Sequence, residues 1–169
     1  MNLVSLTRDV RAELKICPRW PARRVRVDER ALHRLQTIQA GLPQGMNLIL
    51  TRGYEPKANG LGMARRRFRA IGTGMFRLMY PSRSAEIADI FGSNGHDVDG
   101  THVDVSLALH GRRIRMLPLG VFTPPSWQRR YVRRYDAALT VIRSALQAQG
   151  FRIHRNATES LQIHCDLID

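Results

Sequence analysis

The stretch Ser93-Asn94-Gly95-His96-Asp97-Val98-Asp99-Gly100-Thr101-His102-Val103-Asp104-Val105-Ser106-Leu107 contains two patterns in succession. Its first half is a polar loop broken by glycines, and from Thr101 onward polar and apolar residues alternate as they do in a half-buried strand. A loop that delivers His and Asp to the start of a strand is a common way to hold a metal ion. One further histidine, His164, lies near the other end of the chain. We expect these two segments to meet around one zinc ion.

The chain is long enough for one domain with a real core, so residues 1–169 are expected to form a single domain. Hydrophobic residues make up 43% and charged residues 24%, which is ordinary for a globular protein. No apolar run approaches the length of a membrane span, and charged residues interrupt the first 18 positions, so no secretory signal is expected. The protein is therefore expected to be cytoplasmic as synthesised.

The formal net charge is +13, which favours a polyanionic neighbour such as nucleic acid, an anionic membrane or an anionic cell wall. The basic residues are almost all arginine, and they are scattered along the chain in twos and threes. This distribution argues only weakly for nucleic acid. The two cysteines, Cys17 and Cys165, are expected to be free thiols, and without a Cys-x-x-Cys motif a finger-type zinc site is excluded.

Read in order, the chain predicts an α+β fold: a small antiparallel sheet with helices packed on it and the zinc site at the sheet face. Residues 1–27 are expected to be irregular and basic, and Asp28 to cap a helix with the apolar stripe Leu32, Leu35 and Ile38. The remaining expected elements are a strand at 46–52, one or two helices in 57–92 with a break near Gly72–Gly74, a short helix from Pro81 to about 90, a strand at 101–109, a turn at His110-Gly111, a strand at 112–117, one helix from Ser126 to Gly150, and strands at 151–154 and 161–167.

A catalytic zinc site needs about three protein ligands, an open position for water, and a nearby carboxylate as general base. The candidates for these roles are His96, His102, Asp104, His164 and Glu159. The other histidines, His33, His110 and His154, are interpreted as structural residues.

The order of these motifs resembles the zinc D-alanyl-D-alanine peptidase family, whose members include dipeptidases, carboxypeptidases and phage endolysins with a hedgehog-like zinc fold. Its pattern is Ser-x-His-x-x-Gly-x-Ala-x-Asp, then a strand and hairpin, a helix, Gly-Phe and a terminal Glu-x-x-His. Here the corresponding residues are His96, Gly100 and Asp104, then Gly150-Phe151 and His164. Earlier in the chain, Tyr54-Glu55-Pro56 is similar to the Tyr-Arg-Pro of that family.

The resemblance implies His96, Asp104 and His164 as zinc ligands and Glu159 as the catalytic base. His102 is the alternative ligand, because it shares a strand face with Asp104. Asp166 is an alternative base or a partner of a ligand. With Glu55 in place of the family's arginine, Arg52 or one of Arg65, Arg66 and Arg67 would stabilise the charge on the scissile carbonyl. The resemblance assigns substrate binding to Tyr54, Glu55, Ser93 and Asn94.

The sequence thus predicts a zinc metallopeptidase, a hydrolase of carboxypeptidase, dipeptidase or endolysin type that uses a metal-activated water. Its expected substrate is peptidoglycan, muropeptides or their D-amino-acid-containing precursors, reached in the cell wall by a route that needs no signal peptide. Two alternatives stay open: a catalytically impaired member of the same fold that acts as a binding domain, and a basic nucleic-acid-binding protein, the last of these in rank.

Overall fold

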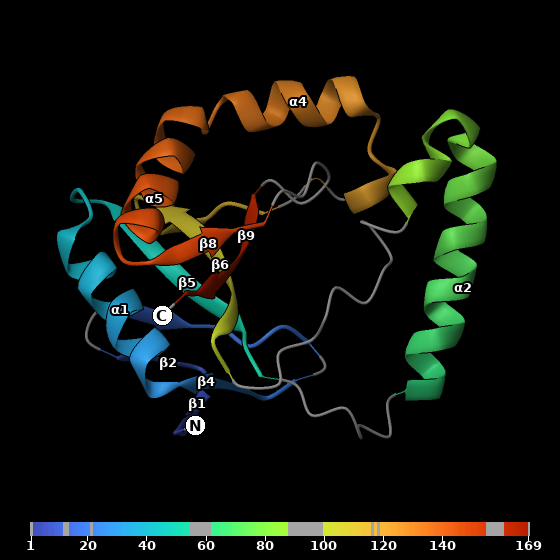
Figure 1. Ribbon diagram of the computed structural model, residues 1–169. Coiled ribbons are helices and arrows are strands. Elements are labelled where there is room, and N and C mark those ends of the chain that lie inside the picture. The colour runs from blue at the N-terminus through green and yellow to red at the C-terminus, as the bar shows by residue number, and fades with distance from the viewer. Residues whose placement is uncertain are drawn as a thin grey trace.

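The protein has an α+β fold, as the order of elements in the sequence predicts (Figure 1). The computed structural model describes residues 2–9, 14–20, 22–54, 67–87, 100–115, 117, 119–154 and 161–168, and the backbone alone of residues 10–11 and 62–66. Among the helices of this described part, none has the length and apolarity that crossing a bilayer requires.

The main sheet has seven strands and is mixed rather than antiparallel throughout. Its strand order is β2 (Asp9–Arg11), β3 (Leu14–Ile16), β5 (Met46–Arg52), β6 (His102–Leu109), β9 (Gln162–Leu167) and β8 (Phe151–Ile153), with β7 (Arg112–Arg113) also paired to β6. The pairs that β6 forms with β5, β7 and β9 are antiparallel, as expected, whereas β3 and β5 run parallel. The parallel pair arises because the chain crosses over between these two strands through a helix.

The expectation that residues 1–27 are irregular was wrong. Besides β2 and β3, this region forms β1 (Leu3–Thr7) and most of β4 (Arg24–Asp28), which pair as a separate antiparallel ribbon. Val25 and Val27 are buried, and Arg24 and Arg26, which alternate with them, are exposed, so β4 has the period of two that defines a half-buried strand. Pro18 lies between β3 and β4, outside both strands.

The helix expected after Asp28 is confirmed as α1 (Glu29–Gly41). The Asp28 carboxylate accepts a hydrogen bond from the Arg30 backbone N–H, which otherwise has no partner in the first turn. The other helical elements are α2 (Gly62–Met79), the 3₁₀ turns η1 (Pro81–Glu86) and η2 (Gly120–Phe122), α4 (Pro125–Arg133) and α5 (Asp136–Ala148).

Two helix boundaries differ from the sequence prediction. The break expected near Gly72–Gly74 is absent, because α2 runs without interruption through both glycines. The single helix expected from Ser126 is instead two helices, since Tyr135 has non-helical backbone angles and separates α4 from α5. One strand boundary differs as well. The strand after the turn was expected to run from Arg112 to Leu117, but β7 ends at Arg113.

Helices α1 and α5 cover one face of the main sheet and bury its apolar side chains (Figure 1). Leu35 and Ile38 of α1 and Leu139, Ile142 and Leu146 of α5 lie in this core. The sheet contributes alternate residues of its central strands, namely Leu48, Leu50, Val103, Val105, Leu107, Ile163 and Cys165. Because side chains alternate along a strand, the residues between them are directed to the opposite face, where the histidines and aspartates lie.

Candidate metal centre

The two segments singled out in the sequence lie side by side as the neighbouring strands β6 and β9 (Figure 1). In their antiparallel register Asp104 is opposite His164, and His102 is opposite Asp166. Opposite residues of paired strands share a face, and residues two apart on one strand do as well. All four side chains therefore project from the same face of the sheet, away from the core under α1 and α5.

Asp104 and His164 form the most buried polar pair of this cluster. The Asp104 side chain is almost fully buried, and its Oδ1 lies 2.7 Å from His164 Nδ1. Gln162 donates to the other carboxylate oxygen at 3.1 Å, and Thr51 donates its hydroxyl to the Asp104 backbone oxygen at 2.9 Å. Burial opposes ionisation of Asp104, but the hydrogen bond and charge of His164 hold its pKa below the usual value. Asp104 is consequently a carboxylate at neutral pH.

A register shift in β5 adds Arg52 to this face. The β5–β6 pairing runs regularly to Leu50 opposite Val105 and then shifts, so that Arg52 is opposite Asp104. Without the shift, Thr51 would be opposite Asp104, and Arg52 would alternate onto the core face. The positive charge of Arg52 contributes to the low pKa of Asp104.

A second histidine–aspartate pair lies beside the first. His154, directly after β8, has its Nε2 2.5 Å from Asp166 Oδ1. Arg152 on β8 also binds Asp166, donating to its two carboxylate oxygens at 3.2 and 2.7 Å. Burial raises the pKa of Asp166, but the hydrogen bonds and charges of Arg152 and His154 together outweigh burial, so the pKa lies below its usual value.

His102 lies between the two pairs. Its ring stacks on that of His154 with the centroids 5.2 Å apart and the planes 18° from parallel. Burial lowers the pKa of His102, and the neighbouring imidazoles of His154 and His164 lower it further against the opposing effect of the two aspartates. His102 is therefore a neutral imidazole at pH 7, which is the form that binds metals.

Two groups in this cluster could hold a metal ion, and both include His102. One is His102, Asp104 and His164, and the other is His102, His154 and Asp166; within each, the ligand atoms lie within 4.8 Å of one another. Imidazole nitrogen and carboxylate oxygen are the donors that zinc accepts in three-ligand sites. The group with Asp104 is the better candidate, because both carboxylate oxygens of Asp166 already accept hydrogen bonds from the Arg152 guanidinium.

The structure brings together three of the residues that the sequence offered as ligands, namely His102, Asp104 and His164, and places Arg52 beside them. Tyr54 lies two residues after β5, where its backbone N–H donates to Arg26 O at 2.7 Å. The other predicted site residues lie outside the described part of the chain: His96, Glu159, Glu55, Ser93 and Asn94. Their assigned roles stay predictions.

The sequence interpretation of His154 as a structural residue missed its position. His154 reaches the cluster because β8 and β9 pair antiparallel. Its N–H donates to His164 O at 2.9 Å, so the two histidines are opposite each other on the paired strands. The register of this strand pair could not be read from the sequence alone, because the connecting residues give no turn signal that fixes it.

Of the two cysteines, Cys165 is buried and Cys17 half-buried, and both are free thiols, as expected.

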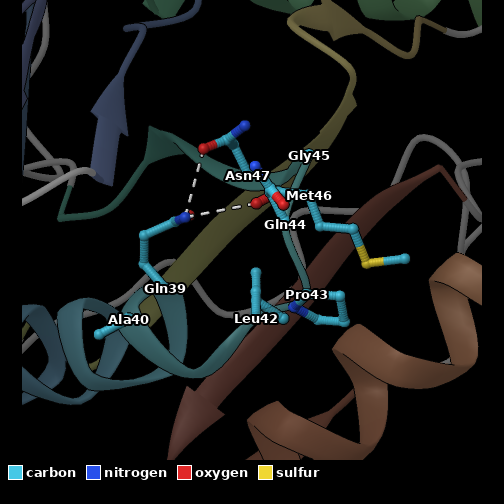
Figure 2. A pocket seen from close by; sticks show the side chains of 8 residues that line it. All are labelled: Gln39, Ala40, Leu42, Pro43, Gln44, Gly45, Met46 and Asn47. Atoms are coloured by element: carbon cyan, nitrogen blue, oxygen red, sulfur yellow. Dashed lines mark hydrogen bonds between the residues drawn. The ribbon is translucent and has the colours of Figure 1, made fainter.

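A pocket away from the histidine cluster is explained by the packing of the α1–β5 connection (Figure 2). It lies where the chain passes from α1 into β5 and is lined by Gln39, Ala40, Leu42, Pro43, Gln44, Gly45, Met46 and Asn47. Gln39 crosses it, donating to Met46 O and Asn47 Oδ1 while accepting from the Leu48 N–H. These bonds satisfy the buried glutamine, and the pocket lies at the opposite end of β5 from Arg52 and the histidine cluster.

Comparison of the chain with protein-family models, with curated proteins and with solved structures finds no match in any of the three. The resemblance to zinc D-alanyl-D-alanine peptidases therefore depends on the motifs of the sequence alone.

Proposed function

We propose that this protein is a zinc-dependent peptidase that hydrolyses peptide bonds in peptidoglycan or its D-amino-acid-containing precursors. The observation that supports this most is the convergence of His102, Asp104 and His164 from two distant segments onto one sheet face. A neutral imidazole and a buried carboxylate are the protonation states that zinc binding needs, so binding would require no costly change of charge at these two residues.

Bound zinc would lower the pKa of a coordinated water and polarise the scissile carbonyl. In this proposal the imidazoles of His164 and of either His96 or His102 would hold the ion together with Asp104, and Gln162 keeps Asp104 oriented through its hydrogen bond. Glu159, with Asp166 as the alternative base, would accept the proton of the attacking water and pass it to the leaving amine as the peptide bond breaks. Arg52, on the same face as Asp104, would donate to the carbonyl oxygen as negative charge develops there.

The first experiment is elemental analysis of protein purified without added metal. We expect about one zinc per chain in the wild type and in the control His33→Ala, whose side chain is exposed on α1. His164→Ala should lose the zinc. Comparing His96→Ala with His102→Ala then identifies the remaining imidazole ligand, because only the variant that removes a ligand should lose metal.

The second experiment measures release of D-alanine from D-Ala-D-Ala peptides and cleavage of purified sacculi. Zinc content together with metal-dependent cleavage supports the peptidase. Stoichiometric zinc without cleavage would favour the alternative of a binding domain on the same fold. Zinc retained in His164→Ala, or a metal-free wild type that binds nucleic acid with strong salt dependence, would contradict the proposal.

A further inference from the structure

Helix α2 exposes a continuous line of large apolar side chains. Phe68 is 76% exposed and Leu78 85%, and the others are at least half exposed. We call this set the α2 stripe, and its members are Phe68, Ile71, Met75, Leu78 and Met79. Single exposed apolar residues are common on protein surfaces, but a contiguous group of them marks an interaction surface.

The spacing puts the stripe on one face of the helix. Phe68, Ile71, Met75 and Leu78 follow one another at intervals of three, four and three residues, and Met79 is four beyond Met75. At 100° per residue these positions fall within an arc roughly 100° wide. Such an arc normally faces a core, yet here it faces outward.

A different side of α2 anchors the helix to the rest of the protein. Phe76 is fully buried, with its ring centroid 5.3 Å from that of Tyr80 and 6.3 Å from that of Phe122. The Arg83 guanidinium lies 5.2 Å from the Phe76 ring centroid, and the Tyr80 hydroxyl donates to Phe122 O at 2.8 Å. Because Phe76 already supplies the contact with the fold, the outward stripe is available for a separate partner.

The positive charge of α2 indicates that its partner is anionic. Its sequence contains five arginines and no aspartate or glutamate. Arg67, Arg69 and Arg77 are exposed, and Arg67 precedes the first residue of the stripe. Figure 1 shows α2 on the opposite side of the molecule from α1 and α5, with its length running along the outside. A basic helix with one apolar face is the form that binds in the interface of an anionic bilayer.

We propose that the α2 stripe docks on an anionic lipid surface. The apolar side chains enter the boundary between headgroups and acyl chains, and the arginines contact lipid phosphates while their stems stay along the apolar layer. A second copy of this chain is a poorer partner, because two such helices packed together would bring their arginines close with no acidic residue of α2 to offset them. The proposal does not depend on the metal centre.

The test is co-sedimentation of the full-length protein with vesicles of phosphatidylcholine alone or mixed with phosphatidylglycerol. We expect binding to the anionic vesicles, weakening as salt is added, and little binding to the neutral ones. The double variant Phe68→Ser/Leu78→Ser should bind at least about tenfold more weakly, because two large apolar transfers are lost. The matched control Leu119→Ser changes a leucine that is 59% exposed outside α2 and should bind like the wild type.

Three outcomes would overturn this proposal. One is absence of binding to the anionic vesicles, and another is equal binding by the stripe variant and the wild type. The third is a wild-type dimer in light scattering that the stripe variant converts to a monomer, since the stripe would then be a contact between copies. Circular dichroism tests whether the variants keep the fold, and their zinc content is compared with that of the wild type, so that failure here is distinguished from failure of the peptidase proposal.

Discussion

Gly100 fixes the point at which the chain enters β6, two residues before His102. Its φ is +84°, and a Cβ built on it would lie 2.4 Å from Leu3 Cδ2 and 2.8 Å from the Asp28 backbone N. The Gly100 carbonyl also accepts the Asp28 N–H at 2.8 Å. Only glycine combines this backbone conformation with so close an approach, so β6 begins against the ribbon of β1 and β4.

Gly100→Ala is expected to destabilise the protein by about 1–3 kcal/mol, because the alanine would be strained in φ and would clash with the backbone of Asp28. Urea denaturation followed by circular dichroism measures the change. The matched control is Gly41→Ala at the end of α1, where a Cβ meets nothing within 4 Å and where we expect stability near that of the wild type. If both alanine variants were equally stable, the close contact at Gly100 would not exist in solution.

Arg52 offers a second prediction at this scale, conditional on the proposed hydrolysis. Arg52→Gln removes the charge next to Asp104 and should lower kcat by about 10²-fold or more, as loss of an oxyanion donor does. Zinc content should stay the same, since Arg52 is not a ligand. Arg24→Gln, at an exposed position of β4, should leave both kcat and zinc unchanged. An Arg52 variant with wild-type kcat would remove this residue from the mechanism.

Single residues with strong local signals could be predicted from the sequence, and pairs across strands could not. The cap at Asp28 and the turn at His110-Gly111, where both residues have positive φ, follow from local chemistry. His102 and Asp104 share a face because of the strand period alone. The neighbours His154 and Asp166 depend on the register of β8 against β9, which no short stretch of sequence specifies.

At the scale of the elements, the start of α1 gives a prediction with a defined pH dependence. Burial disfavours the charged form of Asp28, but the hydrogen bonds and charge of Arg30 outweigh it and lower the pKa of Asp28. Asp28→Ala should destabilise the protein by about 1 kcal/mol at pH 7, the usual cost of losing an N-cap. Asp28→Asn is the matched variant, because it keeps an oxygen acceptor and loses only the charge.

The sign of the pH effect follows from the lowered pKa. The charge of Asp28 stabilises the fold fully above the carboxyl's unfolded pKa of about 3.9, and the effect is lost as pH falls through the lower pKa of the folded state. The stability difference between wild type and Asp28→Asn should therefore shrink on acidification from neutral pH. Chemical denaturation at a series of pH values measures it, and a difference that grows toward low pH would contradict the proposed environment of Asp28.

The helices show why element boundaries are harder to predict than element types. Gly72 and Gly74 lower helix propensity, yet α2 continues through them because the helix is fixed near its end by buried Phe76. The apolar spacing from Val132 to Leu146 continues across the junction of α4 and α5, so it gives no sign of the change at Tyr135. There Tyr131 packs edge-on against Tyr135 and donates to Arg115 O, contacts between segments that a local pattern does not contain.

For the molecule as a whole, the class of fold could be predicted and its sheet only in part. The antiparallel strands around β6 have clear alternation or adjacent turns, whereas β2 and β3 are three residues each and too short for a period to be recognised. The parallel contact of β3 with β5 joins segments separated by β4 and α1. Pairings of that kind depend on the packing of the complete chain, which is why the mixed sheet was not foreseen.

The net charge of +13 yields the prediction that concerns the whole protein. An excess of one sign destabilises a compact state through self-repulsion, and salt screens that repulsion as the Debye length shortens to roughly 10 Å at 0.1 M. The Tm is therefore expected to rise as sodium chloride is added from low ionic strength. Arg130→Glu, at an exposed position of α4 next to the exposed Arg129, should raise the Tm at low salt and flatten its salt dependence. Differential scanning calorimetry measures both quantities, and a Tm that falls with salt would mean that the arginines are held in favourable ion pairs rather than repelling one another.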